Sequence, residues 1–324
     1  MEPAATIFIA GNVVFVIVYL YYMFNRKSKI ANIDEKYVLI TGCDSGFGRA
    51  IAERLDQVGV NVFAACLTDS AVNELKVHSK KMIPFVLDVT NSEQIKNTVA
   101  LVKKKLPDGK GLWGLVNNAG IADSGFIEWL PMETFRKVAD VNLFGLIEVT
   151  CQFLPLIKKE KGRVVNMASL AGIQAPPVAA PYSISKFGLV AFTNTLRFEM
   201  LAFGVRVCCI CPTFFRTNIL DTEKLVTGMN TLFEAVNDEV KESYKDVPEK
   251  VITNLRNIAG EAPVDLNPVV NVVEDALIST KPKNYYFVGK QSILFRIIAS
   301  CPTELSDWLF AKVNPIFRPS MISS

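Results

Sequence analysis

Histidine is nearly absent from this chain of 324 residues: a single one, His78, lies among the charged residues of ELKVHSKK. A Ser-His-Asp hydrolase needs a histidine as its base, and most catalytic zinc sites depend on histidine ligands. A lone histidine between charges is expected to be solvated. The composition therefore argues against these reaction classes, and any catalysis must use other groups.

An excess of charge of either sign is absent as well. The 35 lysines and arginines nearly balance the 32 aspartates and glutamates, so no nucleic acid is expected as a partner. The seven cysteines are scattered, and Cys208, Cys209 and Cys211 lie in the apolar run GVRVCCICP, which favours buried strand positions over a metal site. No N-x-S/T sequon occurs. The sequence thus predicts no metal and favours a reducing, cytosol-facing location.

The N-terminal segment 5–24 contains no charged residue and is followed by the basic stretch NRKSK. About 20 apolar residues span the hydrocarbon core of a bilayer. A cleaved signal peptide carries its positive charge before the apolar run and a small-residue cleavage site after it, and this segment has neither. We therefore expect residues 1–30 to be a retained membrane anchor. The basic flank places the main domain in the cytosol by the positive-inside rule.

Short β-branched runs then alternate with longer amphipathic stretches. Strands are expected at 36–41, 60–66, 82–88, 112–118, 162–168, 205–211 and 284–289, and helices include 47–58, 91–105, 133–158 and 183–203. Near-continuous apolar strands that alternate with helices predict a parallel sheet covered on both faces. The expected fold is α/β, a doubly wound parallel seven-stranded Rossmann sheet over residues 31–290.

Two segments depart from this alternation. The charged, helix-prone insertion 213–265 lies between the sixth and seventh strands, where it would cover a ligand at the carboxyl ends of the strands. The alternative is a surface excursion without ligand contact. The tail 291–324 mixes apolar residues and Trp308 with cations, which favours either a membrane-interfacial segment or a helix packed on the core or on a second copy.

The stretch LITGCDSGFGRAIAERL combines a strand, a glycine-rich turn and a helix. Its Gly42, Gly46 and Gly48 let the backbone approach a pyrophosphate, and the following helix offers N–H groups to the anion. The pattern predicts a dinucleotide site.

The end of the second strand discriminates between the two nicotinamide dinucleotides, because an acidic residue there binds the ribose 2′-hydroxyl and a basic one accepts a 2′-phosphate. Cys66 and the uncharged Leu67 occupy this corner, with no cation nearby, and Asp44 in the glycine-rich turn would repel a phosphate. We therefore expect NAD rather than NADP. Asp88 at the end of the third strand is expected either to contact the adenine edge or only to cap a helix.

Four motifs in this order, TGxxxGxG, NNAG, a serine closing the fifth strand and YxxxK, resemble the short-chain dehydrogenase/reductase family over residues 36–290. The resemblance implies a catalytic set of Ser169, Tyr182 and Lys186, with Asn142 linking the lysine to a relay water. It also implies that Thr217 holds the nicotinamide carboxamide, although Thr213 stands where the family usually has glycine. The implied cofactor contacts are Gly42, Ser45, Gly46, Phe47, Gly48, Cys66, Asp88, Asn118, Ala119, Gly120, Tyr182, Lys186 and Thr217.

The chemistry of PYSISKFG agrees with this assignment. A phenol has an ordinary pKa of about 10, which a nearby ammonium and the charge of an oxidised nicotinamide would lower. Tyr182 and Lys186 are four residues apart, so they share one face of a helix. Tyr182 would then take the proton of an alcohol while Ser169 holds its oxygen. Ser183 and Ser185 lie off that face and are assigned no proton transfer.

Within the family, TGCDSGFG, GLWGLVNNAG, KGRVVN and FGLVAF resemble the branch of membrane-bound retinol, 17β- and 3α-hydroxysteroid and 3-hydroxybutyrate dehydrogenases. The resemblance implies a lipophilic alcohol, retinol or a hydroxysteroid, as substrate. It also implies the endoplasmic reticulum membrane or, alternatively, a mitochondrial one, and a possible homodimer. Two alternatives stay open: a 3-hydroxybutyrate-type enzyme, in which Arg216 would bind the carboxylate, and a dinucleotide-binding scaffold without turnover.

Overall fold

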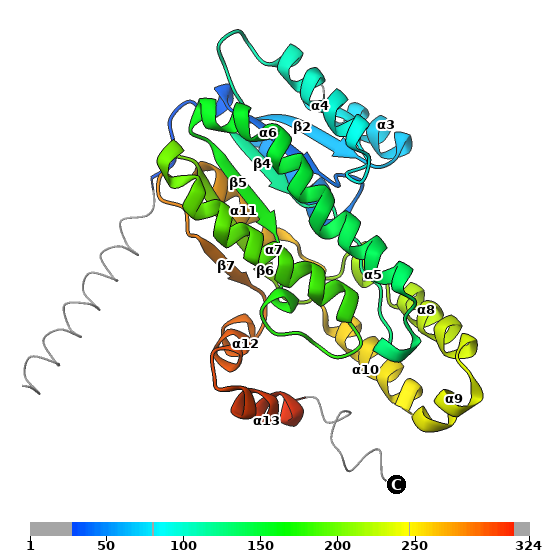
Figure 1. Cartoon of the computed structure of the whole chain (residues 1–324). Coiled ribbons are helices and arrows are strands. Elements are labelled where there is room, and N and C mark those ends of the chain that lie inside the picture. The colour runs from blue at the N-terminus through cyan, green and yellow to red at the C-terminus, as the bar shows by residue number, and fades with distance from the viewer. Residues whose placement is uncertain (1–27, 80, 246, 314–324) are drawn as a thin grey trace, which may run out of the picture.

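The computed structural model describes residues 28–79, 81–245 and 247–313, so the expected membrane anchor lies outside the described residues, except for its last few positions. Seven parallel strands form one sheet in the order β3-β2-β1-β4-β5-β6-β7, which confirms the expected topology (Figure 1). The strands are β1 (Tyr37–Thr41), β2 (Asn61–Cys66), β3 (Ile83–Val86), β4 (Gly114–Asn117), β5 (Arg163–Met167), β6 (Arg206–Pro212) and β7 (Tyr285–Val288). Five of them are nearly or fully buried along their length because both faces of the sheet are covered.

Helices cover the two faces of the sheet. The helices of the sheet layers are α2 (Gly46–Gln57), α3 (Asp69–His78), α4 (Ser92–Lys105), α5 (Met132–Ala139), α6 (Leu146–Glu160), α7 (Ala180–Glu199) and α11 (Asn267–Ile278). One core cluster joins the strands to α2, α3 and α11, where Ile51, Leu75 and Val273 are buried. A second cluster joins the opposite face to α4, α6 and α7. This two-sided packing is the doubly wound arrangement that the sequence predicts.

The expected helix 133–158 is present as one helical stretch, Met132–Glu160, which contains a π-helical segment that the sequence did not predict. A π-helical stretch, Asp140–Gly145, separates α5 from α6. Gly145 lies so close to the chain before α4 that an added Cβ would stand 2.5 Å from the carbonyl oxygen of Val89. The widened turn lets Asn142 lie fully buried between strands and helices. Such π-helical insertions occur mostly at functional sites.

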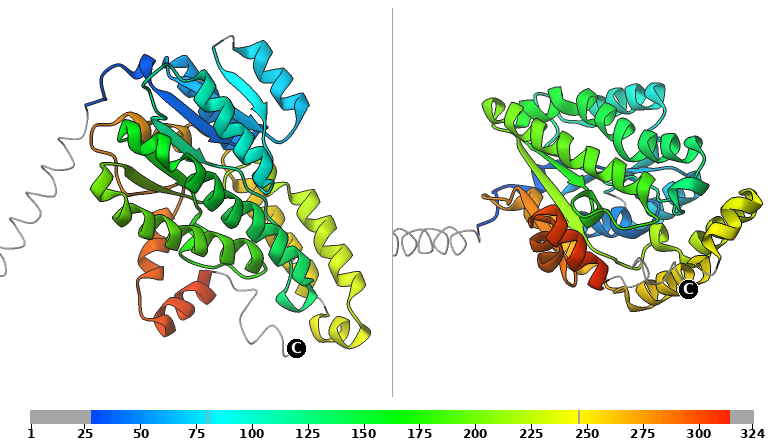
Figure 2. Two further views of the ribbon diagram at one scale, coloured as in Figure 1. Left: turned by 45° about the horizontal axis from the view of Figure 1, so that its top comes forward. Right: turned by 60° about the horizontal axis from the view of Figure 1, so that its bottom comes forward.

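The insertion and the tail form helices beyond the carboxyl ends of the strands (Figures 1 and 2). The insertion contains the short helix Asn218–Leu220, α8 (Thr222–Ala235), α9 (Asp238–Tyr244) and α10 (Val247–Glu261). An aromatic cluster ties it to the short helix Ile127–Trp129: the rings of Trp129 and Phe233 are 5.0 Å apart and those of Trp129 and Tyr244 are 4.9 Å apart. The tail contains α12 (Ser292–Ala299) and α13 (Thr303–Val313).

Within the described part of the chain, one helical stretch, Met132–Glu160, is long and apolar enough to cross a bilayer. Its residues Val149, Phe153 and Ile157 are fully buried in the cluster that joins the sheet to α4 and α7. This stretch is therefore a core helix of the domain.

Candidate active site

The glycine-rich turn lies where β1 passes into α2 and has no space for side chains. Gly42 has a φ of +71°, and a Cβ added there would lie 2.8 Å from the Cα of Ala119. A Cβ on Gly48 would lie 2.1 Å from the carbonyl oxygen of Gly42. Both contacts are with backbone atoms that cannot move aside cheaply. The turn therefore requires glycine for its own closure.

The N-terminus of α2 opens from this turn and fits an anion. Its N-cap residue, Ser45, makes no side-chain cap hydrogen bond, and no acidic residue lies in the first turn. The free N–H groups and the helix dipole at such an end attract a phosphate. Ser45 instead accepts a hydrogen bond from Asn218 Nδ2 at 2.9 Å. Phe47 packs edge-on against Phe215, with ring centroids 5.6 Å apart, so the loop after β6 lies against the turn.

The NNAG motif after β4 holds the same turn from the other side. Asn118 Nδ2 donates to the carbonyl oxygens of Thr41 and Gly42 at 2.9 and 3.0 Å. The backbone N–H groups of Asn118 and Ala119 both donate to Thr41 Oγ1. Gly120 approaches Asn142, whose Oδ1 would lie 3.2 Å from an added Cβ. Four predicted contacts, Gly42, Asn118, Ala119 and Gly120, are thereby brought together.

Asp44 reaches from the glycine-rich turn to the carboxyl end of β2. Its carboxylate accepts hydrogen bonds from the backbone N–H groups of Leu67 and Thr68 at 2.8 and 3.0 Å, and from Thr68 Oγ1 at 3.0 Å. A negative charge thus lies at the corner that contacts the ribose in dinucleotide-binding folds. Cys66 is fully buried beside it, and burial raises the pKa of its thiol to about 12. Its expected cofactor contact stays a prediction.

Asp88 does not cap α4, contrary to one of the two expectations. The N-cap is Asn91, whose side chain accepts from the N–H groups of Glu93 and Gln94. Asp88 Oδ1 instead accepts from the N–H and the hydroxyl of Thr90, at 2.9 and 2.7 Å. Asp88 thus shapes the loop before α4, and its contact with an adenine edge stays a prediction.

Ser169, Tyr182 and Lys186 meet just beyond the end of β5. The hydroxyl of Ser169 is hydrogen-bonded to the Tyr182 phenol. The Nζ atom of Lys186 lies 5.5 Å from the centroid of the Tyr182 ring and donates to the carbonyl oxygen of Met167 at 2.9 Å. Tyr182 and Lys186 come from the first turns of α7, as their spacing predicts. The structure thus places a hydroxyl, a phenol and an amine in one cluster.

Burial dominates the electrostatics of this cluster. Desolvation raises the pKa of the Tyr182 phenol, and the hydrogen bond with Ser169 partly offsets this rise. Lys186 is 3% exposed, and its burial lowers the pKa of the ammonium to about 8. Both shifts arise because the two groups lose water contact, which disfavours each charged form. The expected lowering of the phenol pKa involves the charge of an oxidised nicotinamide as well as the Lys186 ammonium, so it stays a prediction.

Asn142 joins this cluster through Ser185, and its expected link from Lys186 to a relay water stays a prediction. Its Nδ2 donates to the carbonyl oxygen of Ile121 at 2.8 Å and to Ser185 Oγ at 3.1 Å, while its Oδ1 accepts from the N–H of Ile121. Ser185 Oγ in turn donates to the carbonyl oxygen of Tyr182 at 2.7 Å. The sequence assigned no role to Ser185. In the structure it is fully buried and connects Asn142 to the backbone of Tyr182, so we describe it as a positioning residue.

A buried polar network under the site was also not predicted from the sequence. Asn117 Nδ2 donates to Thr150 Oγ1 and to Asn166 Oδ1, at 2.7 and 2.8 Å, and Asn166 Nδ2 donates to Thr193 Oγ1 at 2.9 Å. All four residues are fully buried, and they connect β4, β5, α6 and α7. Asn117 Oδ1 is the one buried side-chain atom of these four residues without a hydrogen-bond partner. Buried networks of this kind fix the relative placement of the elements that carry them.

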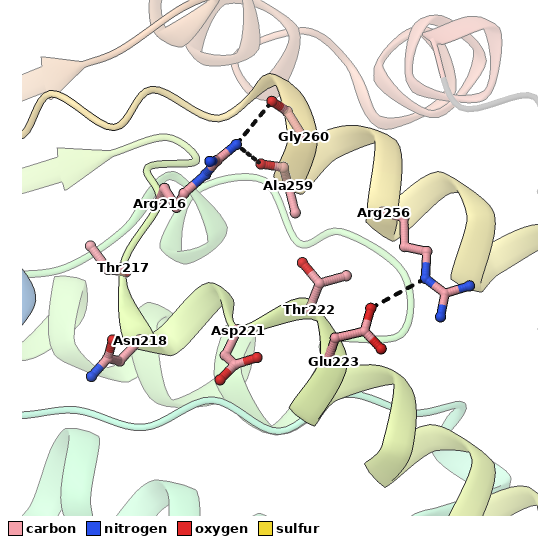
Figure 3. Close-up of a pocket in the computed structure, with 9 residues that line it drawn as sticks. All are labelled: Arg216, Thr217, Asn218, Asp221, Thr222, Glu223, Arg256, Ala259 and Gly260. Carbon is pink, nitrogen blue, oxygen red and sulfur yellow. Dashed lines mark hydrogen bonds and ion pairs between the residues drawn. The ribbon is translucent and has the colours of Figure 1, made fainter.

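The loop after β6 and the insertion line an open pocket of about 540 Å³ (Figure 3). Thr217 lines it and approaches Gly46, with 3.5 Å between the Thr217 Cβ and an added glycine Cβ. Arg216 donates to the carbonyl oxygens of Ala259 and Gly260 near the end of α10, at 3.4 and 3.2 Å. Arg216 therefore holds the insertion to the loop, the structural role that the sequence left open.

In the described part of the chain, no group of three histidine, cysteine or acidic side chains could hold a metal ion. The three cysteines of GVRVCCICP are buried in β6, as expected from their apolar setting.

Comparison with known proteins gives a consistent result. The sequence profile of the family described as short chain dehydrogenase matches residues 36–225. The human protein named dehydrogenase/reductase SDR family member 9 is 40% identical over 299 residues, covering 90% of this chain and 92% of its own. Retinol dehydrogenase 7 of Mus musculus is 40% identical over 287 residues, covering 88% and 90%.

Solved structures agree on the fold. A short-chain dehydrogenase of Burkholderia phymatum, in complex with NAD, superposes with a TM-score of 0.67 at 22% identity and covers 90% of this chain and 98% of its own. One from Burkholderia cenocepacia, in complex with NADP, gives 0.64 at 21% identity, covering 88% and 98%. At these identities the likeness establishes the fold alone.

Proposed function

The chain belongs to the short-chain dehydrogenase family and is an oxidoreductase, and from this premise we propose that it oxidises a lipophilic alcohol, retinol or a hydroxysteroid, with NAD. The observation that carries the proposal is the cluster of Ser169, Tyr182 and Lys186 beyond β5, at the same end of the sheet as the glycine-rich turn after β1. A hydroxyl, a phenol and an amine at the carboxyl end of a Rossmann sheet suit proton transfer to and from an alcohol oxygen. When bound, the nicotinamide ring accepts the hydride from the alcohol carbon.

Tyr182 is the proposed base for the alcohol proton. Its phenol must lose a proton before it can accept one, and burial opposes this loss in the free chain. The positive charge brought by an oxidised dinucleotide, together with the Lys186 ammonium, would favour the phenolate. Ser169 would donate a hydrogen bond to the substrate oxygen and stabilise its developing charge. The structure thus supports a base that becomes effective only after the cofactor has bound.

The proposed preference for NAD rests on Asp44. Its carboxylate lies at the end of β2, bound to the N–H groups of Leu67 and Thr68. A 2′-phosphate at this corner would meet a negative charge, whereas a 2′-hydroxyl could donate to it. No lysine or arginine occurs between Arg54 and Lys76, so the β2–α3 turn itself carries no cation for such a phosphate.

A lipophilic substrate is supported by the surroundings of the site. The insertion 213–265 is proposed to cover the substrate, and its neighbourhood carries exposed apolar side chains, among them Phe214 and Ile219. A relative, at 40% identity, is named a retinol dehydrogenase. Arg216 is engaged with backbone carbonyl oxygens, which weighs against its use as a carboxylate ligand for 3-hydroxybutyrate.

A panel of alcohols tests the proposal. The full chain in detergent is supplied with NAD or NADP and with retinol, androstanediol or 3-hydroxybutyrate, and formation of the reduced cofactor is followed by absorbance. We expect turnover of retinol or the steroid with NAD. Turnover of the hydroxyacid alone would replace the substrate proposal, and no turnover with any alcohol would favour a dinucleotide-binding scaffold.

Two matched variants test the base. Tyr182→Phe removes one phenol oxygen and should lower kcat by at least about 10³-fold, within the range for loss of a general base, while NAD binding is retained. Tyr37→Phe makes the same deletion at the start of β1, at the opposite end of the sheet, and should leave kcat unchanged. Appreciable activity in Tyr182→Phe would remove the phenol from the mechanism.

We propose that residues 1–30 anchor the enzyme in the endoplasmic reticulum membrane with the catalytic domain in the cytosol; a mitochondrial membrane is the alternative. Intact microsomes treated with protease test the orientation, since a cytosolic domain is digested and a lumenal one is protected. Cross-linking in the same membranes tests for the homodimer that the family resemblance implies.

A further inference from the structure

The helix α12 exposes large aliphatic side chains opposite its buried side. Ser292 and Ile298 are buried against the domain. Ile293, Leu294 and Ile297 are 71%, 48% and 58% exposed. At 100° per residue these three side chains share one half of the helix surface. An eight-residue helix therefore presents to solvent the type of face that a soluble domain normally buries.

The helix α13 exposes an aromatic face with a cation on it. Leu305 and Trp308 are 45% and 53% exposed, and Lys312 lies on the same face, with its Nζ 3.8 Å from the centroid of the Trp308 ring. Arg296 on α12 likewise lies 4.7 Å from the ring centroid of Phe287. Tryptophan and aliphatic side chains flanked by lysine or arginine are the composition of segments that lie at a membrane–water interface.

These two helices lie beside the loop 169–179 that joins β5 to α7, here called the catalytic loop because it begins with Ser169. α12 packs against β7 and against the short helix Leu170–Gly172, which directly follows Ser169. Ser306 Oγ of α13 is hydrogen-bonded to Gln174 Oε1 in the same loop, at 3.5 Å. Figures 1 and 2 show α12 and α13 projecting beyond the end of β7, apart from α8–α10.

The start of the described chain is fixed beside the amino end of β7, whereas α12 follows the carboxyl end of the same edge strand. Ser28 Oγ is hydrogen-bonded to Thr280 Oγ1 at 2.6 Å, and the Thr280 N–H donates to the Ser28 carbonyl oxygen, just before β7. The uncharged segment 5–24 ends four residues before Ser28. Four fully extended residues span at most about 14 Å. If that segment crosses a bilayer, the bilayer surface must lie close to the amino end of β7, and a bilayer that follows this edge strand would reach α12 at its other end.

We propose that the exposed side chains Ile293, Leu294, Ile297, Leu305 and Trp308, here called the α12–α13 face, rest in the surface of a phospholipid bilayer. The aliphatic side chains would lie at the level of the upper acyl chains. Lys312, Arg296 and the exposed Lys290 would face the phosphate groups. The catalytic loop would then lie next to the lipid surface. If the proposed lipophilic substrate is correct, it could pass from the bilayer to Ser169 without crossing water.

Tryptophan quenching tests this contact without requiring turnover. The full chain is reconstituted into phosphatidylcholine vesicles, with and without lipids brominated in the upper acyl chain. The emission contributed by Trp308 is isolated as the difference between the wild type and Trp308→Phe, because Trp113 and Trp129 remain in both. We expect brominated lipid to quench at least half of this difference and aqueous iodide to quench little of it.

Two other results would overturn the proposal. Quenching of the Trp308 emission by iodide and not by brominated lipid would show a face in water. Quenching by neither would show that protein, the chain's own residues 314–324 or a second copy, covers the face.

Paired variants identify the side chains that make the contact. The double variant Ile293→Ser/Ile297→Ser should reduce the bromine quenching of Trp308 severalfold, since both exposed aliphatic groups are lost from the apolar phase. Val77→Ser changes a side chain that is 86% exposed on α3, at the other edge of the sheet, and should leave the quenching unchanged. Unchanged quenching in the double variant, or an equal loss in both variants, contradicts the assigned face. The quenching measurements need no turnover, so a chain that oxidises none of the tested alcohols could still show the proposed membrane contact. The proposed function and the proposed membrane contact are therefore tested separately.

Discussion

Replacing the buried amine of Lys186 should stabilise the folded protein at neutral pH while abolishing activity. Burial lowers the pKa of Lys186 from 10.5 to about 8. At about 1.36 kcal/mol per pKa unit, the charged amine costs the folded state about 3 kcal/mol at pH 7. Lys186→Met removes this cost but leaves the Met167 carbonyl oxygen without its donor, a loss of about 1–2 kcal/mol. The expected net gain is about 1–2 kcal/mol at pH 7.

The sign of this difference should reverse at high pH. Below pH 8, Lys186 is protonated in both the folded and the unfolded chain, so its cost is fully present. Between pH 8 and about 10.5 the folded state releases the proton first, so the unfolded state binds more protons and the wild type gains stability relative to the variant. Above pH 10.5 the cost is gone, and the neutral amine still donates to Met167. The wild type should then be the more stable protein.

Urea unfolding of the full chain in detergent, followed by tryptophan fluorescence at pH 7 and pH 10.5, measures both differences. Lys96→Met, which removes an amine exposed on α4, is the control and should change the free energy of unfolding by less than about 0.5 kcal/mol. A Lys186→Met variant that is less stable than the wild type by the same amount at both pH values would refute the argument that burial of the charge is costly.

Three further perturbations follow from the contacts at the site. Asp44→Ala removes the carboxylate at the end of β2, so the ratio of kcat/KM with NADP to that with NAD should rise by about tenfold, equivalent to about 1.4 kcal/mol; an unchanged ratio would exclude Asp44 from cofactor choice. Gly48→Ala places a Cβ 2.1 Å from the carbonyl oxygen of Gly42, so the free energy of unfolding should fall by about 1–3 kcal/mol and the Kd for NAD should rise, as measured by urea unfolding and calorimetry. Burial raises the pKa values of the Cys66 and Cys208 thiols to about 12. The folded state therefore keeps protons that the unfolded chain loses from about pH 8.5. The free energy of unfolding should fall as the pH rises from there towards 12. Cys208→Ala should make that fall in the melting temperature shallower.

The sheet was predictable because each strand is a short apolar run between polar turns, a pattern that depends only on local sequence. The π-helical stretch Asp140–Gly145 was not, because residues 133–158 keep the hydrophobic spacing of one continuous helix. Distant backbone approaches the helix at this stretch, where a Cβ added to Gly145 would stand 2.5 Å from the Val89 carbonyl oxygen. Contacts of that kind have no local signature.

At the site, too, some residues could be assigned from the local sequence and others only from the fold. The pair Tyr182 and Lys186 could be placed on one helix face from their spacing alone. By contrast, Arg216 could not be assigned to a structural or a binding role until α10 brought the carbonyl oxygens of Ala259 and Gly260 beside it. The role of Ser185 depended on Asn142, more than forty residues earlier in the chain. Residue types and spacings therefore give the proposed reacting groups, whereas the groups that position them could be found only from the fold.

The electrostatics of the cluster shows what the fold adds to the chemistry. From spacing alone, a lysine beside a tyrosine implies a lowered phenol pKa. In the folded chain both groups are desolvated, and this effect raises the pKa of Tyr182 and lowers that of Lys186, so the unliganded site favours two neutral groups as the pH approaches 8. A site in this state resists forming the phenolate until further positive charge arrives. Because an oxidised dinucleotide would carry that charge, we expect the proposed base to be coupled to cofactor binding. The kcat/KM for the alcohol should therefore show a lower apparent pKa at saturating NAD than Tyr182 has in the free enzyme, as pH–rate profiles and direct titration of the phenol absorbance can establish.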